Sequence, residues 1–312
     1  MRTPLMPSLE HEGKLYFKPE NLQPVGSFKL RGAYNKIAAL SGVERQRGVI
    51  AYSSGNHAQA VAYAARAMRT KAVIVMPAVA PEVKRRGTAA LGAEIVLVGP
   101  GSDERQARAE ALAAEHGYTI VPPFNDEQII AGQGTIGLEI IEDLADVQTI
   151  LVPVSGGGLI SGVSSAIKLL SPKCKVIGVE PELAADAQAS FRSGQRVSLP
   201  AEQTTRTIAD GLRSQSVGAI PFEHIRKYVD DIVTVSEDEI REAVRRLLAT
   251  RLVIEPSGAV PHAAFTFHRE ELPTGKTVAV LSGGNIDPAL LREILDASTP
   301  ADVSVQSRVF SR

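Results

Sequence analysis

Short apolar runs alternate with longer segments of helical pattern along most of the chain. The runs have the length of strands and are bounded by Gly, Pro or charged residues, which predicts β-strands. They cover residues 72–76, 94–98, 149–154, 176–179 and 277–281. The segments of helical pattern cover residues 59–68, 103–116, 159–170 and 237–250. Strands that alternate with helices indicate an α/β fold with parallel sheets and helices on both faces.

The alternation falls into two blocks, which predicts two open-sheet lobes. Residues 48–124 hold strand–helix units of their own, and the stretch from Val121 to Asp126 reads as a crossing back to the other lobe. We therefore expect a small domain at 48–124 and a large domain built from 1–47 and 125–312. A cleft between two such lobes is where a small ligand would bind. The tail from Ser298 is expected to be peripheral.

Composition excludes several classes of protein. The chain has 312 residues, of which 44% are apolar and 22% charged, and these are globular values. Its net charge of -1 gives no bulk attraction to nucleic acid or to an anionic membrane. No apolar run is long enough to span a membrane, and the N-terminus lacks the pattern of a signal peptide. Cys174 is the sole cysteine, which excludes an internal disulfide. We expect a cytoplasmic protein.

Turns rich in Gly or Ser occur at residues 53–57, 155–158, 255–258 and 282–285. Three of them follow predicted strands, and ligands bind at the carboxyl ends of strands in open α/β sheets. The turn at 155–158 lies between a strand and an apolar helix, where exposed N–H groups could cradle a phosphate. It could also begin a dinucleotide site with Glu180 on the ribose, although Ser161 stands where that fingerprint needs Gly. A third interpretation is a tight packing turn.

Other residues carry weaker signals, each with a structural alternative. Residues 53–57 precede a helix expected to begin near Ala58, and they suit a bound carboxylate or an elaborate N-cap. Lys29 lies between apolar neighbours, where a lysine has a lowered pKa and can form a Schiff base, but most lysines are solvated. Glu180 and Asp186 frame a loop that could hold a hard cation or simply be solvated.

Taken together, these segments resemble the fold-type II pyridoxal-phosphate enzymes, most closely the threonine/serine dehydratase and serine racemase group. Residues 18–32 carry the resemblance most specifically, and the turns at 53–57, 155–158 and 282–285 follow in the family's order. The resemblance covers nearly the whole chain and implies a fold like that of the tryptophan synthase β-subunit.

The resemblance also implies roles for individual residues. Lys29 would carry pyridoxal 5'-phosphate as an internal aldimine. The other cofactor contacts would come from Phe28 at the ring, Asn56 at the 3-hydroxyl, Ser155, Gly156, Gly157 and Gly158 at the phosphate, and Ser282 at the ring nitrogen with Glu255 nearby. The substrate carboxylate would be received by Ser53, Ser54, Gly55 and His57. Ser54 is also where racemases keep a second acid or base. In some relatives a divalent cation (Mg²⁺, Mn²⁺ or Ca²⁺) is bound by residues that match Glu180, Asp186 and the carbonyl of Ala184.

The implied reaction is an α,β-elimination that converts a 3-hydroxy amino acid such as L-threonine or L-serine to a 2-oxo acid and ammonia. The alternatives are a serine or aspartate-type racemase and a 3-hydroxyaspartate dehydratase on the same cofactor. An NAD-dependent oxidoreductase and a non-catalytic binding protein are more distant alternatives. We expect a homodimer or a higher homo-oligomer. The chain lacks both the helix that usually precedes Arg2 and a regulatory domain after the Ser282 turn, so feedback control is not expected.

Overall fold

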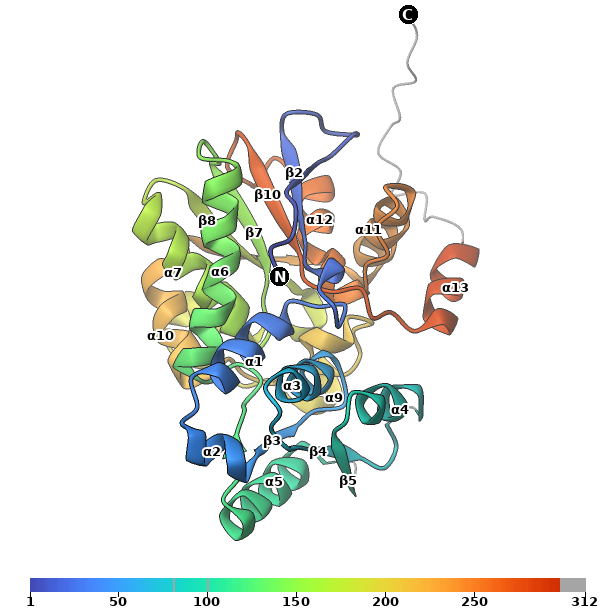
Figure 1. Ribbon diagram of the computed structural model, residues 1–312. Coiled ribbons are helices and arrows are strands. Elements are labelled where there is room, and N and C mark those ends of the chain that lie inside the picture. Colours follow the sequence, from blue (N-terminus) through green and yellow to red (C-terminus); the bar gives the residue numbers. More distant parts are fainter. Residues whose placement is uncertain (81, 100, 298–312) are drawn as a thin grey trace, which may run out of the picture.

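The computed structural model describes residues 1–80, 82–99 and 101–297, and within these the strands form a six-stranded and a four-stranded sheet (Figure 1). The larger sheet has the order β1 (Met6–Pro7), β2 (Leu15–Pro19), β10 (Thr277–Leu281), β7 (Thr149–Pro153), β8 (Lys175–Pro181) and β9 (Asp231–Val235). The smaller sheet has the order β5 (Glu94–Val98), β4 (Ala72–Pro77), β3 (Val49–Tyr52) and β6 (Thr119–Ile120). Neighbouring strands are parallel, apart from the antiparallel pair β1 and β2. The α/β prediction is confirmed.

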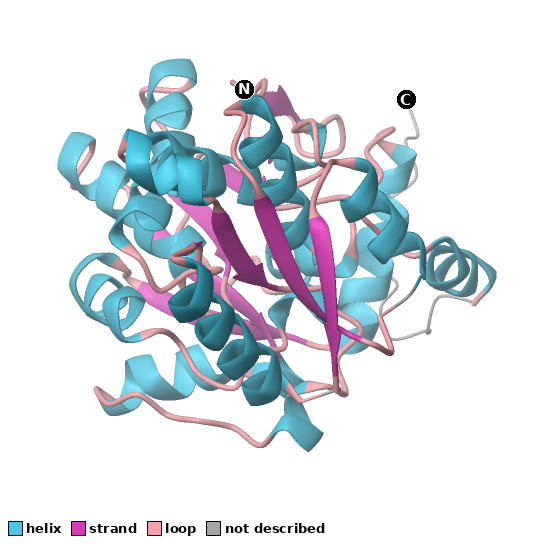
Figure 2. Cartoon of the chain, turned by 60° about the horizontal axis from the view of Figure 1, so that its bottom comes forward, coloured by secondary structure: helices cyan, strands magenta, loops and turns pink. Residues whose placement is uncertain are grey.

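Helices surround the strands on both faces of the sheets (Figure 2). The helices of the first half of the chain are α1 (Lys29–Ala38), α2 (Gly42–Arg47), α3 (Asn56–Ala67), α4 (Glu82–Ala90), α5 (Ser102–His116) and α6 (Glu127–Asp143). Those of the second half are α7 (Gly158–Leu170), α8 (Asp186–Ser193), α9 (Ala201–Thr204), α10 (Ala219–Tyr228), α11 (Glu237–Ala249), α12 (Pro256–Phe267) and α13 (Pro288–Asp296). The 3₁₀ turns are η1 (Glu20–Leu22), η2 (Glu182–Ala184) and η3 (Asp210–Leu212). The tail from Ser298, which we expected to be peripheral, lies outside the described residues.

Each predicted strand and helix is present, with bounds that differ by a few residues. The N-terminus of α11 is a capping box in which the Ser236 hydroxyl accepts from the Glu239 N–H. One bound was wrong: α3 begins at Asn56 rather than near Ala58, because Gly55 already serves as the N-cap. Several elements lie outside the predicted ranges, among them β2, which carries a buried Lys18, the long helix α6, and α12, which contains Pro261.

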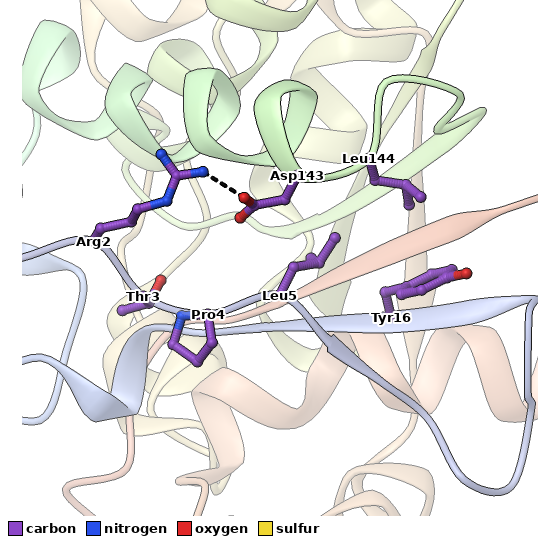
Figure 3. A pocket seen from close by; sticks show the side chains of 7 residues that line it. All are labelled: Arg2, Thr3, Pro4, Leu5, Tyr16, Asp143 and Leu144. Atoms are coloured by element: carbon purple, nitrogen blue, oxygen red, sulfur yellow. Dashed lines mark hydrogen bonds and ion pairs between the residues drawn. The ribbon is translucent and has the colours of Figure 1, made fainter.

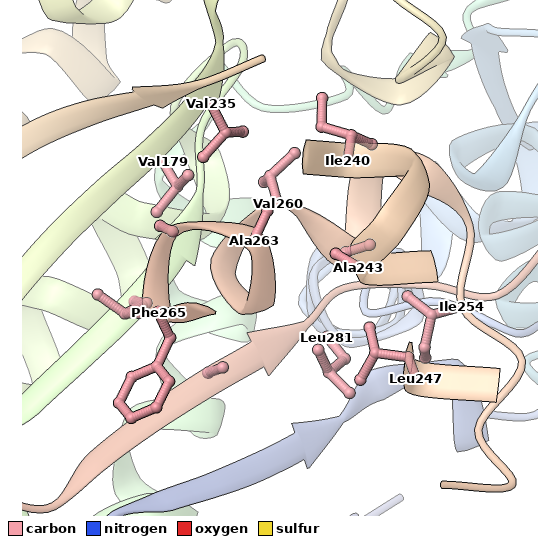
Figure 4. Close-up of a cluster of buried hydrophobic side chains, with 14 of the residues drawn as sticks. Val179, Val235, Ile240, Ala243, Leu247, Ile254, Val260, Ala263, Phe265 and Leu281 are labelled. Atoms are coloured by element: carbon pink, nitrogen blue, oxygen red, sulfur yellow. The ribbon is translucent and has the colours of Figure 1, made fainter. Parts of the chain in front are cut away.

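The apolar core has separate parts on the two sheets. On the larger sheet, side chains of α11 and α12 pack against the strands, as Val260, Leu247 and Leu281 show in Figure 4. On the smaller sheet, the apolar side of α1, with Leu30 and Ile37, belongs to the same cluster as β3 and β4. Helix α1, from before residue 48, thus packs on α3 of the smaller-sheet unit and also on α6, which covers the larger sheet with α7.

Helices α6 and α7 cross closely because glycines lie at their contact. A Cβ atom at Gly162 would lie 2.6 Å from the backbone nitrogen of Gly134 and nearer still to the carbonyl oxygen of Ile130. A Cβ atom at Gly137 would lie 2.9 Å from the Cβ of Ala166. Because α7 starts at the turn 155–158, this contact helps to fix the position of that turn.

We expect Gly162→Ala to destabilise the protein, by about 1–3 kcal/mol, because the added methyl group would collide with the backbone of α6. Gly87→Ala in α4 is the matched control, since a Cβ at Gly87 would meet no atom within 4 Å. That change is expected to stabilise by about 0.5–1 kcal/mol through helix propensity. Urea unfolding of both variants measures the difference, and equal effects of the two changes would contradict the packing argument.

Candidate active site

Lys29 is the first residue of α1, and its side chain is partly buried against the segment 121–124. Its Nζ donates a 2.7 Å hydrogen bond to the carbonyl of Pro123 and lies 5.1 Å from the centre of the Phe28 ring. Among the described residues no carboxylate forms an ion pair with it. Burial alone lowers the pKa of Lys29 to about 8, because the charged form loses its hydration. The amine is therefore poised to act as a nucleophile or a base near neutral pH.

A largely buried group of four charged side chains sets the place of α1, and we call it the Arg31 cluster (Lys18, Glu20, Arg31 and Glu139). Arg31 donates from Nε and Nη2 to the two oxygens of Glu20, at 2.7 and 2.8 Å. It donates from Nη1 and Nη2 to Glu139, at 2.6 and 2.8 Å. Lys18 donates to the Thr3 carbonyl and pairs with Glu139, both at 2.7 Å.

The Arg31 cluster joins several parts of the chain through paired charges. Its two cations balance its two carboxylates, so no net charge is left uncompensated in the interior. Arg31 is two residues from Lys29, Glu20 belongs to η1, and Glu139 belongs to α6. Bidentate pairing of a guanidinium with a carboxylate restricts both distance and orientation. The first turn of α1, and with it the backbone of Lys29, is thus held between η1 and α6.

The turn 282–285 lies beside Lys29 in space. The Phe28 N–H donates to the Ser282 carbonyl at 3.0 Å, and Ser27 forms an antiparallel bridge with Gly283. The Ser282 side chain is buried, and its hydroxyl is 3.5 Å from the Ser257 carbonyl. The structure therefore brings two of the predicted cofactor contacts, Phe28 and Ser282, to the same place as the amine.

Asn56 connects the smaller sheet to the larger one through its amide. Its Nδ2 donates to Glu255 Oε1 at 2.7 Å, and its Oδ1 accepts from Asn285 Nδ2 at 2.7 Å. Burial, with the negative charge of Asp210 nearby, raises the pKa of Glu255 to about 7. A Cβ atom at Gly283 would lie 2.5 Å from Glu255 Oε1, so a larger residue there would displace the Glu255 carboxylate. Elements of both sheet units therefore meet at Asn56, the predicted ligand of the 3-hydroxyl.

Residues 53–57 follow the carboxyl end of β3 and open α3. The Gly55 N–H donates to the Ser53 hydroxyl at 3.3 Å, and Ser54 is half-buried. The His57 ring nitrogen Nε2 is 2.8 Å from the Val121 carbonyl. Burial and the nearby positive charge of Lys29 lower the pKa of His57 to about 3, so the imidazole is neutral. This loop offers a helix N-terminus and hydroxyl groups, which suit a carboxylate.

The turn 155–158 connects β7 to α7 and leaves little room for a Cβ atom at its three glycines. Gly157 has φ +89°, and a Cβ there would lie 2.7 Å from Pro221 Cβ at the start of α10. A Cβ at Gly158 would lie 2.9 Å from Phe124, and one at Gly156 would collide with the same ring. The Gly218 N–H donates to the Gly156 carbonyl at 3.1 Å, which places the N-terminus of α10 beside that of α7.

These features fit a phosphorylated aldehyde cofactor. Two helix N-termini next to a glycine turn give the positive potential that a phosphate needs. Ser155 adds a hydroxyl, which accepts from the Ser214 N–H at 3.3 Å. The segment 121–124 contacts both the lysine and the turn, because Lys29 donates to the Pro123 carbonyl and Phe124 packs against Gly156 and Gly158. The residues predicted to hold pyridoxal phosphate are therefore gathered in one region.

Glu180, Ala184 and Asp186 form a second group of predicted ligands, at the end of β8 and the start of α8. Glu180 accepts from the backbone N–H groups of Ala187 and Gln188, at 3.1 and 2.8 Å. Neither oxygen of the buried Asp186 has a well-formed hydrogen bond to a described residue. Burial raises the pKa of Asp186 to about 7, and burial together with the Asp186 charge raises that of Glu180. Within the described chain, no group of three or more His, Cys, Asp or Glu side chains could hold a metal.

Several contributors to the site were missed at the sequence level. Pro123 and Phe124 lie in the segment predicted only as a crossing, and Asn285 lies in a turn noted only for Ser282. Pro123 acts through its backbone carbonyl and Phe124 through the packing of its ring, and neither leaves a recognisable residue pattern in the sequence.

A surface hollow of about 570 Å³ lies elsewhere, lined by none of the predicted site residues (Figure 3). No helix of the described residues is long and apolar enough to cross a membrane.

Comparison with known proteins places this geometry in a family. Residues 1–283 match the family model described as pyridoxal-phosphate dependent enzyme. The chain is 48% identical over 285 residues to the L-threonine ammonia-lyase of Thermotoga maritima, covering 91% of this chain and 70% of that protein. It is 45% identical to the L-threo-3-hydroxyaspartate ammonia-lyase of Saccharomyces cerevisiae, covering 88% of this chain and 83% of that protein.

A solved structure shows the same relationship in three dimensions. The processed form of threonine deaminase isoform 2 from Solanum lycopersicum is 39% identical, with a TM-score of 0.89, and the match covers 94% of this chain and 87% of that one. This result decides against the nicotinamide cofactor that the segment from Gly156 to Glu180 had left open. With a buried amine, a glycine turn at paired helix ends and a match across most of its length, the chain belongs to the family of pyridoxal-phosphate dependent enzymes and shares the fold of its type II members.

Proposed function

We propose that the chain is an ammonia-lyase that converts L-threonine, and L-serine as a second substrate, to a 2-oxo acid and ammonia. One observation carries the proposal: the Lys29 amine, with a pKa of about 8, is close enough to His57 of the loop 53–57 to lower its pKa, and the neighbouring Phe28 bonds to Ser282. The identity to an L-threonine ammonia-lyase over most of the chain supports the choice of substrate.

The residues of this chain would hold the cofactor at three points. The turn 155–158 would bind its phosphate, Asn56 its 3-hydroxyl, and Phe28 would pack on its ring. When bound through Lys29, pyridoxal phosphate would supply an electron sink for the negative charge that develops at the substrate Cα. Ser282 offers an uncharged hydroxyl at the expected place of the ring nitrogen. It would not enforce protonation there, which favours prompt departure of the β-hydroxyl group.

Proton transfers would fall to two side chains. Residues 53–57 would hold the substrate carboxylate, which turns the Cα proton toward the Lys29 amine. Lys29 would take that proton at Nζ, and Ser54 is the candidate to protonate the leaving hydroxyl group. Ser54 is also the residue that a racemase would use to return a proton to the opposite face. The balance between elimination and racemisation therefore depends on which proton Ser54 moves.

Lys29→Ala is expected to abolish the visible absorbance of protein-bound cofactor and to lower 2-oxo acid release from L-threonine by about 10²- to 10⁴-fold or more. Lys173→Ala is the control, because Lys173 is exposed in the turn between α7 and β8, which holds none of the predicted site residues. The same assay with L-serine and 3-hydroxyaspartate, read for both keto acid and chiral inversion, tests the alternatives. Faster inversion than elimination would replace the lyase by a racemase.

The lowered pKa of Lys29 predicts how fast the cofactor-free protein takes up pyridoxal phosphate at different pH values. Only the neutral amine attacks the aldehyde, so the rate should rise about tenfold per pH unit and level off near pH 8. A rate that keeps rising up to pH 10.5 would show a lysine with the ordinary pKa of 10.5. Glu255→Gln is the control, since it removes the other nearby group with a pKa near neutrality.

We further propose that Glu180, Asp186 and the Ala184 carbonyl bind a divalent cation such as Mg²⁺, Mn²⁺ or Ca²⁺. The buried Asp186 carboxylate has no well-formed hydrogen bond, and a hard cation would satisfy its oxygens. The backbone of Val217 lies close enough to affect the Asp186 carboxylate, and the next residue, Gly218, bonds to the phosphate turn. A bound cation would therefore help to hold the turn 155–158 in place, through the backbone of Val217 and Gly218.

Millimolar Mg²⁺ or Mn²⁺ is expected to raise the thermal midpoint of the wild-type protein relative to protein in chelator, because a cation that binds only the folded state stabilises it. Asp186→Asn should lose this rise. Glu182→Gln in the same loop, where the side chain is exposed, should keep it. A cation effect that survives Asp186→Asn would place the ion elsewhere.

Three further proposals rest on the sequence and the family resemblance. We propose that residues 48–124 act as the small domain that carries the carboxylate loop, opposite a large domain of 1–47 and 125–312. We propose a homodimer or a higher homo-oligomer as the assembly and the cytoplasm as the location.

A further inference from the structure

An ion pair joins the two sheets at a second point, away from Asn56. Lys84 lies on α4, which packs on α3 and β5 of the smaller sheet. Asp210 lies in η3, which packs on α12 beside the larger sheet. The Lys84 Nζ is 3.1 Å from Asp210 Oδ2. This pair therefore crosses the same boundary as the Asn56 hydrogen bonds.

The Asp210 end of the pair is tied to the predicted cofactor loops. The Gly211 N–H donates to the Ser257 hydroxyl at 2.8 Å, and the Ser257 carbonyl is next to Ser282. The Ser214 N–H donates to the Ser155 hydroxyl at 3.3 Å. One short loop thus contacts both the phosphate turn and the neighbour of the ring-nitrogen serine. The backbone that carries Asp210 is therefore held against the larger-sheet unit by these two hydrogen bonds.

The Lys84 end of the pair is tied to the predicted carboxylate loop. Helix α4 packs against α3, and α3 begins with Asn56, directly after the loop. A cavity of about 260 Å³ is lined by Lys84 and Asp210 and also by Glu255 and Asn285, the two partners of Asn56. A shift of α4 away from η3 would therefore widen this cavity and stretch the hydrogen bonds of Asn56 to Glu255 and Asn285.

We propose that Lys84 and Asp210 are positioning residues, whose ion pair holds the loop 53–57 and Asn56 in register with the cofactor loops of the larger sheet. Neither residue needs to contact the reacting atoms. The pair acts by favouring the arrangement in which the substrate carboxylate and the Cα proton are correctly placed for Lys29.

Exposure makes this pair a reversible contact. The side chains of Lys84 and Asp210 are 29% and 47% exposed, so water and salt screen their attraction. Such a pair contributes little to global stability, but it can shift the balance between two arrangements by severalfold. Loss of the pair should therefore weaken substrate binding more than folding.

The test compares Lys84→Glu, Asp210→Lys and the double variant that exchanges the two charges. Each single variant is expected to raise KM for L-threonine by about threefold to tenfold, with kcat within about twofold of wild type. The double variant should recover most of the loss, because opposite charges again face each other. Arg86→Glu is the matched control: Arg86 lies on the same helix and pairs with Glu82, also on α4, with both side chains well exposed.

Hydrogen–deuterium exchange of residues 53–60 supplies a readout that does not depend on turnover. It should speed up in both single variants and return toward the wild-type rate in the double variant, with thermal midpoints unchanged. The kinetic part rests on the proposed lyase reaction, whereas the exchange part stands even if another reaction is found. The proposal is overturned if the exchanged-charge variant shows no recovery, or if Arg86→Glu has the same effect as Lys84→Glu.

Discussion

The paired charges of the Arg31 cluster are the constraint on which the site depends. A lysine amine can be kept buried and partly neutral only if the backbone that carries it cannot move toward water. Arg31 provides this two residues away, because its guanidinium is held by Glu20 on one side and Glu139 on the other. Lys18 and Thr3 complete the pairing from the N-terminal segment. The cluster stabilises the fold because each of its charges has an opposite charge beside it. Removal of one partner would leave another charge buried and unpaired.

The rest of the site relies on partial charges more than on ions. Helix ends, backbone N–H groups and amides converge from both sheets, since carboxyl edges of parallel strands place the following turns together. His57 stays neutral, Glu255 titrates near neutrality, and Ser282 is uncharged. A site of this kind would recognise a small zwitterion by local dipoles. The near-zero net charge of the chain is consistent with such recognition, because no long-range field is required.

The sequence predicted the parts of this molecule that have regular periodicity or a recognisable order of motifs. The β-branched strands are of this kind, and so is the residue set around Lys29, whose gathering in one region the structure now shows. Their individual roles remain predictions. Helix α12 was missed because Pro261 and Gly258 break the helical pattern, yet burial of nearly the whole helix outweighs their weak propensity. The Pro123 carbonyl and the Lys84–Asp210 pair could not be foreseen, because each depends on how separate loops meet after folding.

The bridge between Ser27 and Gly283 has a consequence for the order of events during synthesis. Residues near the start of the chain bond to residues near its end, and Asn56 bonds to Glu255 and Asn285, which lie 199 and 229 positions later. Contacts of such sequence separation form late, after local helices and strands. A nascent chain therefore cannot assemble a complete pocket until nearly all of it has left the ribosome. Cofactor binding would therefore follow the docking of β10, the last strand among the described residues.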